Sequence, residues 1–190
     1  MFRAPRQVLK VCALGVILVV SVALQVKTGF CADQSINDLR YDFPENDDPG
    51  LIGVAVGYFD FAKQDKNQAL DLRAEFRPAL NIGVMRPWAA LETTNDGSIY
   101  AAGGLLVDLN LSDHWVLTPS VGAGGYHRGE GKDLGSVLQF RVQGDIAYRF
   151  ENGSRLALSV SHLSNARTSH HNPGAEIISL YYFIPVEWLF

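Results

Sequence analysis

Apolar and polar residues alternate along much of the chain after Gly50, and this period of two constrains the fold more than any other feature. Residues 70–77 read Leu-Asp-Leu-Arg-Ala-Glu-Phe-Arg, and residues 137–150 alternate over a stretch longer than most soluble strands. Successive side chains of a strand point to opposite faces, so each such segment has one apolar and one polar face. The pattern therefore predicts β-strands rather than helices.

Two architectures fit such strands. In a soluble antiparallel sandwich the polar faces meet water, whereas in a membrane barrel they line a closed interior. We favour the barrel because the strands reach the roughly 9–11 residues that a tilted strand needs to cross a bilayer. A sheet in lipid must also close, since an open edge would leave backbone groups unpaired. We therefore expect an all-β, eight-stranded antiparallel transmembrane β-barrel.

The eight strands are expected at 51–59, 68–77, 85–94, 98–110, 114–127, 136–150, 154–164 and 176–190. The third is the weakest, because Pro87 and Trp88 interrupt it. Tight turn sequences alternate with longer polar loops at 60–67, 128–135 and 165–175. Outer-membrane barrels have short periplasmic turns and longer outer loops, so we expect both termini in the periplasm and these three loops outside.

The two faces of the barrel wall make further predictions. Charged residues on the polar face are expected to form an interior network, which comprises Arg73, Glu75, Arg141, Asp145 and Arg149. Aromatic residues near the C-terminus are candidates for the girdles that outer-membrane barrels have at the membrane interfaces. These are Tyr181, Tyr182 and Trp188.

The start of the chain has the order of a secretory signal peptide: a basic segment, an uncharged apolar run at 11–24, and small residues ending at Ala32. The apolar run is short for a membrane span. We assign residues 1–32 to a signal peptide and residues 33–190 to the barrel with a short periplasmic leader. The expected location is the outer membrane of a Gram-negative-type cell.

Removal of the signal peptide takes four cations and no acid from a chain with 16 Lys and Arg against 20 Asp and Glu. The mature chain is then strongly acidic, which argues against a nucleic-acid partner. Cys12 lies in the signal peptide and Cys31 at its end. A disulfide framework and a cysteine-based metal site are therefore not expected.

Polar residues end an apolar row on the seventh strand. His162 and Ser164 continue the face that begins with Leu156, Leu158 and Val160, and this face should contact lipid. Glu176 stands at the head of the apolar row of the eighth strand. The two strands are antiparallel neighbours joined by one loop, so Glu176 should start close to where His162 and Ser164 end.

A hydroxyl, an imidazole and a carboxylate at one edge of a lipid-facing surface have a definite chemical use. Ser164 needs a base to become a nucleophile, His162 can be that base, and Glu176 can orient the imidazole. His-x-Ser alone is common, and a barrel rim is polar in any case. A carboxylate near lipid is costly without a role, however, which favours a functional site.

The segment 161–166, Ser-His-Leu-Ser-Asn-Ala, resembles the His-x-Ser-Asn-Ala motif of the lipid A 3-O-deacylase family, the PagL-type outer-membrane esterases. Asn-Pro-Gly at 172–174, then Glu176, then a tyrosine-containing strand with Ile-Pro at 184–185, follow in similar order and spacing. Close resemblance covers residues 155–186. The rest of the chain is similar only as barrel architecture.

The resemblance implies a Ser164 nucleophile, a His162 base and a supporting Glu176. It also implies that Asn165 or Asn172 could supply an amide donor to the oxyanion, with the backbone as an alternative. The implied reaction is hydrolysis of the 3-O-linked hydroxyacyl ester of lipid A in the outer leaflet, with no metal and no other cofactor. Lipid A of lipopolysaccharide is then the substrate and outer-membrane lipids are the surroundings. The oligomeric state is left open, with a homodimer among the options.

Two other functions remain compatible with the sequence: a non-enzymatic barrel with a structural or adhesion role, and a different lipid enzyme such as an acyltransferase or a phospholipase.

Other candidate residues rank lower. The outer-loop cations could pair with lipid A phosphates, but ordinary loop charge is favoured for Lys63, Arg128, Lys132 and Arg167. Solvated loop residues are likewise the favoured interpretation of His170 and His171, and no metal-ligand spacing surrounds His114 and His127.

Overall fold

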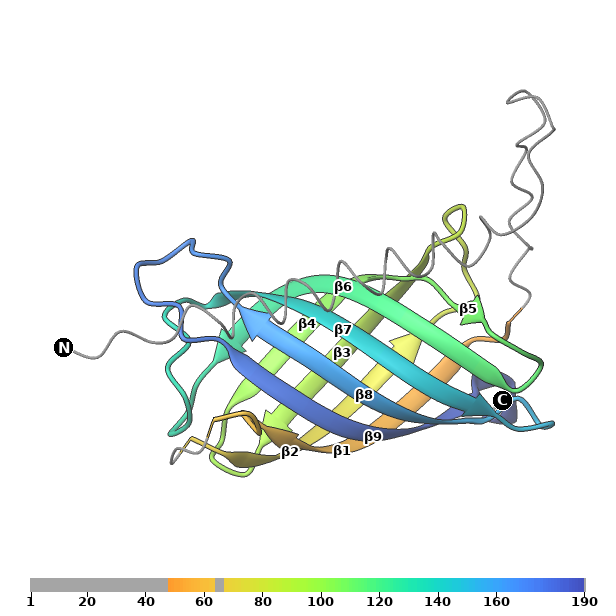
Figure 1. Cartoon of the computed structure of the whole chain (residues 1–190), viewed down its shortest axis with the longest axis horizontal. Coiled ribbons are helices and arrows are strands. Elements are labelled where there is room, and N and C mark those ends of the chain that lie inside the picture. The colour runs from red at the N-terminus through yellow and green to blue at the C-terminus, as the bar shows by residue number, and fades with distance from the viewer. Residues whose placement is uncertain (1–47, 64–66, 190) are drawn as a thin grey trace, which may run out of the picture. The chain divides into compact units, whose positions relative to one another are not determined.

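The computed structural model describes residues 48–63 and 67–189, and these form one closed antiparallel barrel (Figure 1). The predicted fold is confirmed. The strands are β1 (Leu51–Phe59), β2 (Ala69–Arg77), β3 (Arg86–Thr94), β4 (Ile99–Leu106), β5 (Leu109–Asn110), β6 (Trp115–His127), β7 (Leu138–Arg149), β8 (Arg155–Ser164) and β9 (Ala175–Pro185). The predicted signal peptide at 1–32 and most of the leader lie outside the described residues.

Eight long strands make up the wall, and β5 only extends it by two residues. Each long strand pairs with its neighbours in chain order, and two further pairings, β1 with β9 and β4 with β6, close the circle. All pairings are antiparallel. Loops 60–68, 128–137 and 165–174 therefore lie at one end, called here the long-loop end, and the start of β1 and the end of β9 lie at the other, called the terminal end. In the described part of the chain no helix is long and apolar enough to cross a membrane.

The last strand is shorter than predicted. It ends at Pro185 instead of continuing to Phe190, and a 3₁₀ turn, Val186–Trp188, follows. Proline has no N–H to donate, so Pro185 is a natural end for a ladder. The chain then turns over the start of β1, where the N–H of Val186 donates to the carbonyl of Gly50 at 2.8 Å.

The fourth predicted strand, 98–110, is interrupted between β4 and β5 at Val107 and Asp108. Asp108 keeps the inward phase of Tyr100 and Leu106, and its carboxylate lies 3.3 Å from Arg86 and 3.1 Å from Arg155. The two guanidinium groups offset the cost of burying the Asp108 charge.

The third strand is continuous, contrary to the expected weakness. Pro87 and Trp88 lie within β3 opposite Leu105 and Gly104 of β4. The Trp88 indole points inwards and packs over Gly122 of β6, where a Cβ atom would lie 2.4 Å from the ring. The missing side chain of Gly122 therefore makes room for a bulky residue inside a narrow barrel.

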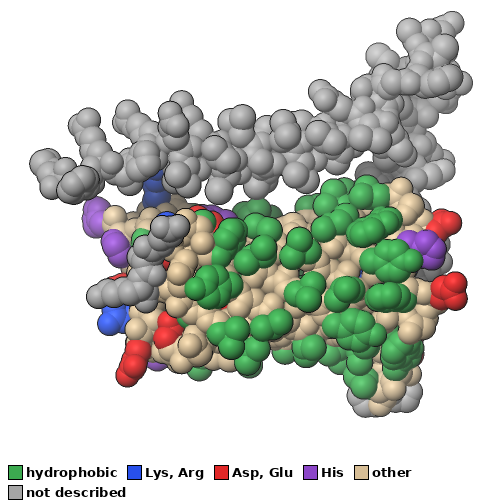
Figure 2. Space-filling model, turned by 60° about the horizontal axis from the view of Figure 1, so that its bottom comes forward, with side chains coloured by type: hydrophobic (Ala, Val, Ile, Leu, Met, Phe, Trp, Pro, Cys, Tyr) green, Lys and Arg blue, Asp and Glu red, His purple; other side chains and the backbone are tan. Residues whose placement is uncertain are grey.

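The outer face of the wall is apolar. Side chains at alternate positions are about half exposed, among them Val54, Leu72, Leu91, Val121, Leu158 and Leu180. Figure 2 shows a band of hydrophobic side chains along one face of the barrel, with charged and histidine side chains gathered at the two ends. Such a band, on a barrel without open edges, is what a bilayer requires of a spanning sheet.

The interior is filled by ion pairs, as the alternation predicts. Glu92 lies between two guanidinium groups: Arg73 approaches it at 2.6 and 2.8 Å, and Arg141 also donates to it. The same layer contains Glu75, Arg77, Gln143, Asp145 and Tyr181. Arg149 is the exception among the predicted members, because it lies half-buried at the terminal end, 3.0 Å from Asp48.

Of the three aromatic residues predicted for the girdles, two lie on the outer surface and one does not. Tyr182 and Trp188 are exposed on the outer surface. Tyr181 is fully buried, since odd-numbered residues of β9 face the interior, and its hydroxyl donates to Glu75. At the terminal end, Tyr148 stacks on His114 with ring centroids 5.4 Å apart. This pair adds an aromatic group to the surface of the barrel at the terminal end.

Glu92→Gln is expected to destabilise the barrel by roughly 3–5 kcal/mol, because among the described residues Arg141 then has no carboxylate within 4.0 Å and Arg73 keeps only Glu75, at 3.9 Å. Urea unfolding in lipid vesicles, followed by tryptophan fluorescence, measures the change. The matched control is Glu151→Gln in an exposed turn, where a change within about 0.5 kcal/mol is expected. Equal stability of the two variants would contradict the stabilising role of the Glu92 ion pairs.

Candidate functional site

The structure places His162 of β8 directly opposite Glu176 of β9 as a cross-strand pair. Nδ1 of His162 lies 3.3 Å from Oε1 of Glu176, within ion-pair distance but without the alignment of a hydrogen bond. The His162 side chain is 37% exposed and that of Glu176 is 14% exposed. Both residues belong to the outward-facing rows of their strands at the long-loop end, as predicted.

Ser164 is the last residue of β8 and lies on the same outward face as His162, two positions further along. The pairing of β8 with β9 ends one residue earlier, at Leu163 and Ala175. On its other side Ser164 is paired with Phe140 of β7. The serine thus stands where the wall opens into loop 165–174, half-buried and beside an exposed aromatic ring.

The inward faces of the same strand ends are packed tightly. Leu163, Ala175 and Ile177 are fully buried in an apolar cluster at the long-loop end, together with Phe59, Tyr100, Tyr126 and Leu134. A fully buried aliphatic side chain stabilises its position by about 1.5–3 kcal/mol. The polar residues on the outer face are therefore carried by strand ends that cannot easily move.

Asn165 organises the loop that follows. Its amide nitrogen donates to the carbonyls of Leu134 at 2.9 Å and His171 at 2.7 Å, and its side-chain oxygen accepts from the N–H of Arg167. Its own backbone N–H donates to the side-chain oxygen of Asn172 at 3.1 Å. The Asn165 side chain is completely buried. Both of its amide hydrogens are already used, so it acts within the loop rather than towards a ligand.

Gly174 lets the loop approach the imidazole closely. Its φ is +64°, in the left-handed region that favours glycine. A Cβ atom at this position would lie 2.9 Å from Cε1 of His162. The backbone at Gly174, just before β9, therefore lies against one side of the His162 ring. Glu176 approaches the same ring from another side.

A lysine from a distant loop reaches the same segment. Nζ of Lys63, between β1 and β2, donates to the carbonyls of Pro173 at 2.7 Å and Gly174 at 3.0 Å, and lies 3.7 Å from Oε2 of Glu176. Lys132 donates to the buried Asp60 carboxylate beside it. Burial lowers the pKa of the Lys132 amine, although its hydrogen bond to Asp60 opposes the shift.

These contacts change the interpretation of the loop cations. Ordinary loop charge was the favoured interpretation for Lys63 and Lys132, but the first is half-buried with defined acceptors and the second is 5% exposed. Arg128 fits ordinary loop charge, since its side chain pairs only with Asp133 within the described part of the chain and both side chains are 58% exposed. No alternation or motif indicates the Lys63 contacts, because they join residues 110 positions apart.

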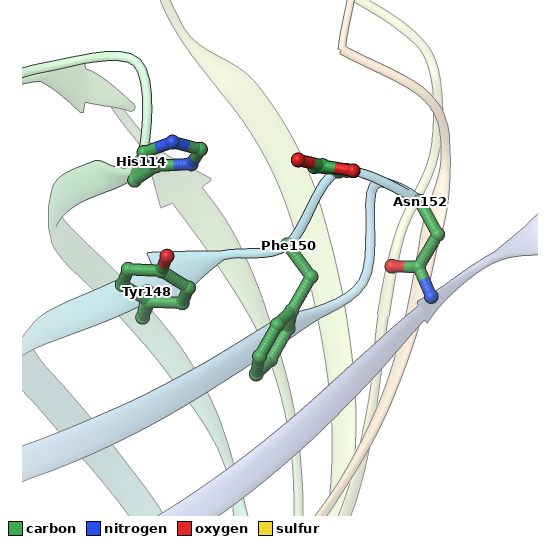
Figure 3. A pocket seen from close by; sticks show the side chains of 5 residues that line it. His114, Tyr148, Phe150 and Asn152 are labelled. Atoms are coloured by element: carbon green, nitrogen blue, oxygen red, sulfur yellow. The ribbon is translucent and has the colours of Figure 1, made fainter.

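Two shallow pockets lie away from the His162–Glu176 pair. One, at the terminal end, is lined by His114, Tyr148, Phe150, Glu151 and Asn152; Figure 3 shows its histidine above the tyrosine ring. The other lies at the long-loop end between the end of β6 and loop 128–137. Among the residues that the structure describes, no group of His, Cys, Asp and Glu is arranged to hold a metal ion.

A closed eight-stranded wall with an apolar outer band, an ion-paired interior and polar residues at one rim defines a small outer-membrane β-barrel. Comparison with known proteins narrows this class. The family model described as lipid A 3-O-deacylase (PagL) matches residues 83–185. The chain belongs to this family.

Solved structures agree on the fold. The crystal structure of the outer membrane enzyme PagL has a TM-score of 0.54 and 20% identity, covering 72% of this chain and 99% of that one. Neisserial surface protein A, NspA, has a TM-score of 0.50 and 9% identity, covering 72% of this chain and 95% of that one. At these identities the likeness concerns the barrel alone. No curated protein matches the chain by sequence.

Asn165→Asp is expected to loosen loop 165–174, because the isosteric carboxylate would face two carbonyls with no hydrogen to donate. Each buried group left unsatisfied costs about 1–3 kcal/mol. Trypsin cleavage after Arg167 of the folded barrel should therefore become faster. The control is Asn152→Asp, since Asn152 uses only its side-chain oxygen, towards Ser154. Equal cleavage rates in both variants and the wild type would show that Asn165 does not hold the loop.

Proposed function

We propose that this protein is a lipid A 3-O-deacylase that hydrolyses the ester of the 3-linked hydroxyacyl chain with Ser164, His162 and Glu176. The supporting observation is the contact of His162 with Glu176, at 3.3 Å, on the lipid-facing side of a barrel whose family is that of the lipid A 3-O-deacylases. Ser164 follows on the same face. A hydroxyl, a base and a carboxylate are the parts that acyl transfer to a serine needs.

The first half of the reaction forms an acyl-enzyme. The Ser164 hydroxyl attacks the ester carbonyl, and His162 takes its proton. The tetrahedral intermediate collapses with cleavage of the ester C–O bond, and the imidazolium returns the proton to the departing 3-hydroxyl of lipid A. In the second half, water gives its proton to His162 and attacks the acyl carbonyl. The hydroxy fatty acid leaves, and Ser164 recovers its proton from the imidazolium.

Glu176 serves the base in this scheme. The carboxylate faces Nδ1 of His162, which directs the other ring nitrogen, Nε2, to the serine and stabilises the imidazolium when it forms. For the oxyanion we favour Asn172 over Asn165. The Asn165 amide hydrogens are used by the carbonyls of Leu134 and His171, whereas Asn172 uses its oxygen and keeps its NH₂ group as a donor.

The orientation and maturation of the protein complete the proposal. Residues 1–32 are removed as a signal peptide during export, and the remaining chain inserts with its long-loop end outward. The three longest connections, 60–68, 128–137 and 165–174, all lie at the long-loop end, which supports this direction. The site then lies level with the outer leaflet, where lipid A is the substrate.

Ser164→Ala is expected to abolish deacylation, with kcat falling by at least about 10³-fold because the nucleophile is lost. Purified protein is incubated with lipid A in detergent, and the products are weighed by mass spectrometry. The wild type should release one hydroxyacyl chain, and so should the control Ser169→Ala in the loop that follows β8. Equal deacylation by Ser164→Ala would overturn the proposed mechanism. A gain of one chain would indicate an acyltransferase, and intact lipid A with cleaved phospholipid would indicate a phospholipase.

Gly174→Ala is expected to lower kcat on the order of 100-fold, because the added methyl group displaces the His162 ring. The control is Gly97→Ala, at φ +80° in a turn where a Cβ atom meets nothing within 4 Å. It carries the same left-handed strain but should keep full activity. Steady-state rates on lipid A separate the two effects. Equal losses in both variants would mean that backbone strain, not the ring contact, is responsible.

A further inference from the structure

Lys63 is held in place before any substrate arrives. It follows the buried Asp60, whose carboxylate is bound by Lys132 and lies 3.8 Å from Nζ of Lys63. Its own backbone N–H donates to the carbonyl of Asp60 at 3.2 Å, and the N–H of Phe61 donates to the carbonyl of Glu176 at 3.0 Å. The loop after β1 is thus hydrogen-bonded directly to the first residues of β9.

The two carbonyls that Lys63 binds belong to the segment that determines the geometry of the site. Pro173, Gly174 and Ala175 connect Asn172, the favoured oxyanion donor, to Glu176. Gly174 also packs on the His162 ring. The Lys63 ammonium group therefore holds the short segment that links Asn172 to Glu176 and contacts the His162 ring.

Lys63 also faces the side of Glu176 that is turned away from the imidazole. Oε1 of Glu176 points to His162, whereas Oε2 lies 3.7 Å from Nζ of Lys63 and has no hydrogen bond among the described residues. A cation at this distance favours the ionised carboxylate in a site with little water around it. Lys63 thereby opposes the cost of keeping Glu176 charged beside lipid.

The number of donors argues against a role in binding phosphate. An ammonium group has three hydrogens. Two are given to the carbonyls of Pro173 and Gly174, and two carboxylates, of Asp60 and Glu176, lie within 4 Å for the third. A lipid phosphate that accepted the third hydrogen would lie beside both carboxylates and would be repelled by their charge.

We propose that Lys63 is a positioning residue, which holds the Pro173–Gly174 segment and Glu176 against His162. The inference rests on the proposed esterase function and adds a residue to it that no motif contains. Lys63 acts only through other groups, since its donors are directed to protein acceptors. Its loss should then slow the chemical step without weakening substrate binding.

The experiment compares Lys63→Met, Lys63→Arg and the wild type on two substrates, lipid A and p-nitrophenyl butyrate, which carries no phosphate. Lys63→Met should lower kcat on the order of 100-fold on both substrates with KM nearly unchanged. Lys63→Arg keeps a cation with several donors and should recover part of the loss on both. Rates are expressed per folded barrel, measured by heat-dependent migration in detergent gels. The control is Arg128→Met, which removes an exposed cation at the same end and should match the wild type.

The outcomes separate the inference from the function on which it rests. A raised KM for lipid A alone, with unchanged rates on the small ester, would make Lys63 a phosphate ligand and overturn its positioning role. Full activity of Lys63→Met would overturn it too, as would equal losses in Lys63→Met and Lys63→Arg. A wild type that is inactive on both substrates would overturn the proposed function, and the inference with it. A wild type active only on the small ester would exclude lipid A while still testing Lys63.

Discussion

The closure of the sheet is the constraint on which the rest of the structure depends. Lipid offers no partners for backbone N–H and C=O groups, so β1 must pair with β9 and β4 with β6. Eight strands enclose a space that side chains nearly fill. The residues that fill it are long and charged, and each charge in such a space needs a partner at short range. Layers of ion pairs around Glu92 and Asp108 follow from that need.

Closure also fixes the site, because it sets the register of every strand. In the observed register His162 is opposite Glu176, and both face outwards. A slip of one residue would turn the whole outward row of β9, Glu176 included, into the barrel. The apolar cluster behind the pair, with Leu163 and Ile177 fully buried, opposes such a slip. The contact of the imidazole with the carboxylate is therefore a consequence of packing on the other face of the same strands.

The alternation of apolar and polar residues predicted the positions and faces of the strands. It did not predict the contacts that the loops make. The alternation located the strands to within a few residues, assigned His162 and Glu176 to outward faces, and gave most of the interior network. The end at Pro185 was missed because the alternating pattern continues past it, although the ladder cannot. Asn165 and Gly174 were visible in the motif, but their contacts depend on how the loop folds back over itself.

The division between strands and loops bears on how the site keeps its shape. A pair on adjacent strands is held by the ladder and by the buried faces behind it, but loops open at much lower free energy than strands. The segment between Asn172 and Glu176 leaves the ladder just where the proposed chemistry needs precision. Hydrogen bonds from Asn165 and Lys63 bring it back to the wall, one from within the same loop and one from a loop 110 residues earlier. The proposed reaction needs a rim that is open to lipid and to water, and such a rim cannot be buried. Hydrogen bonds to the loop then replace the packing that a core would supply.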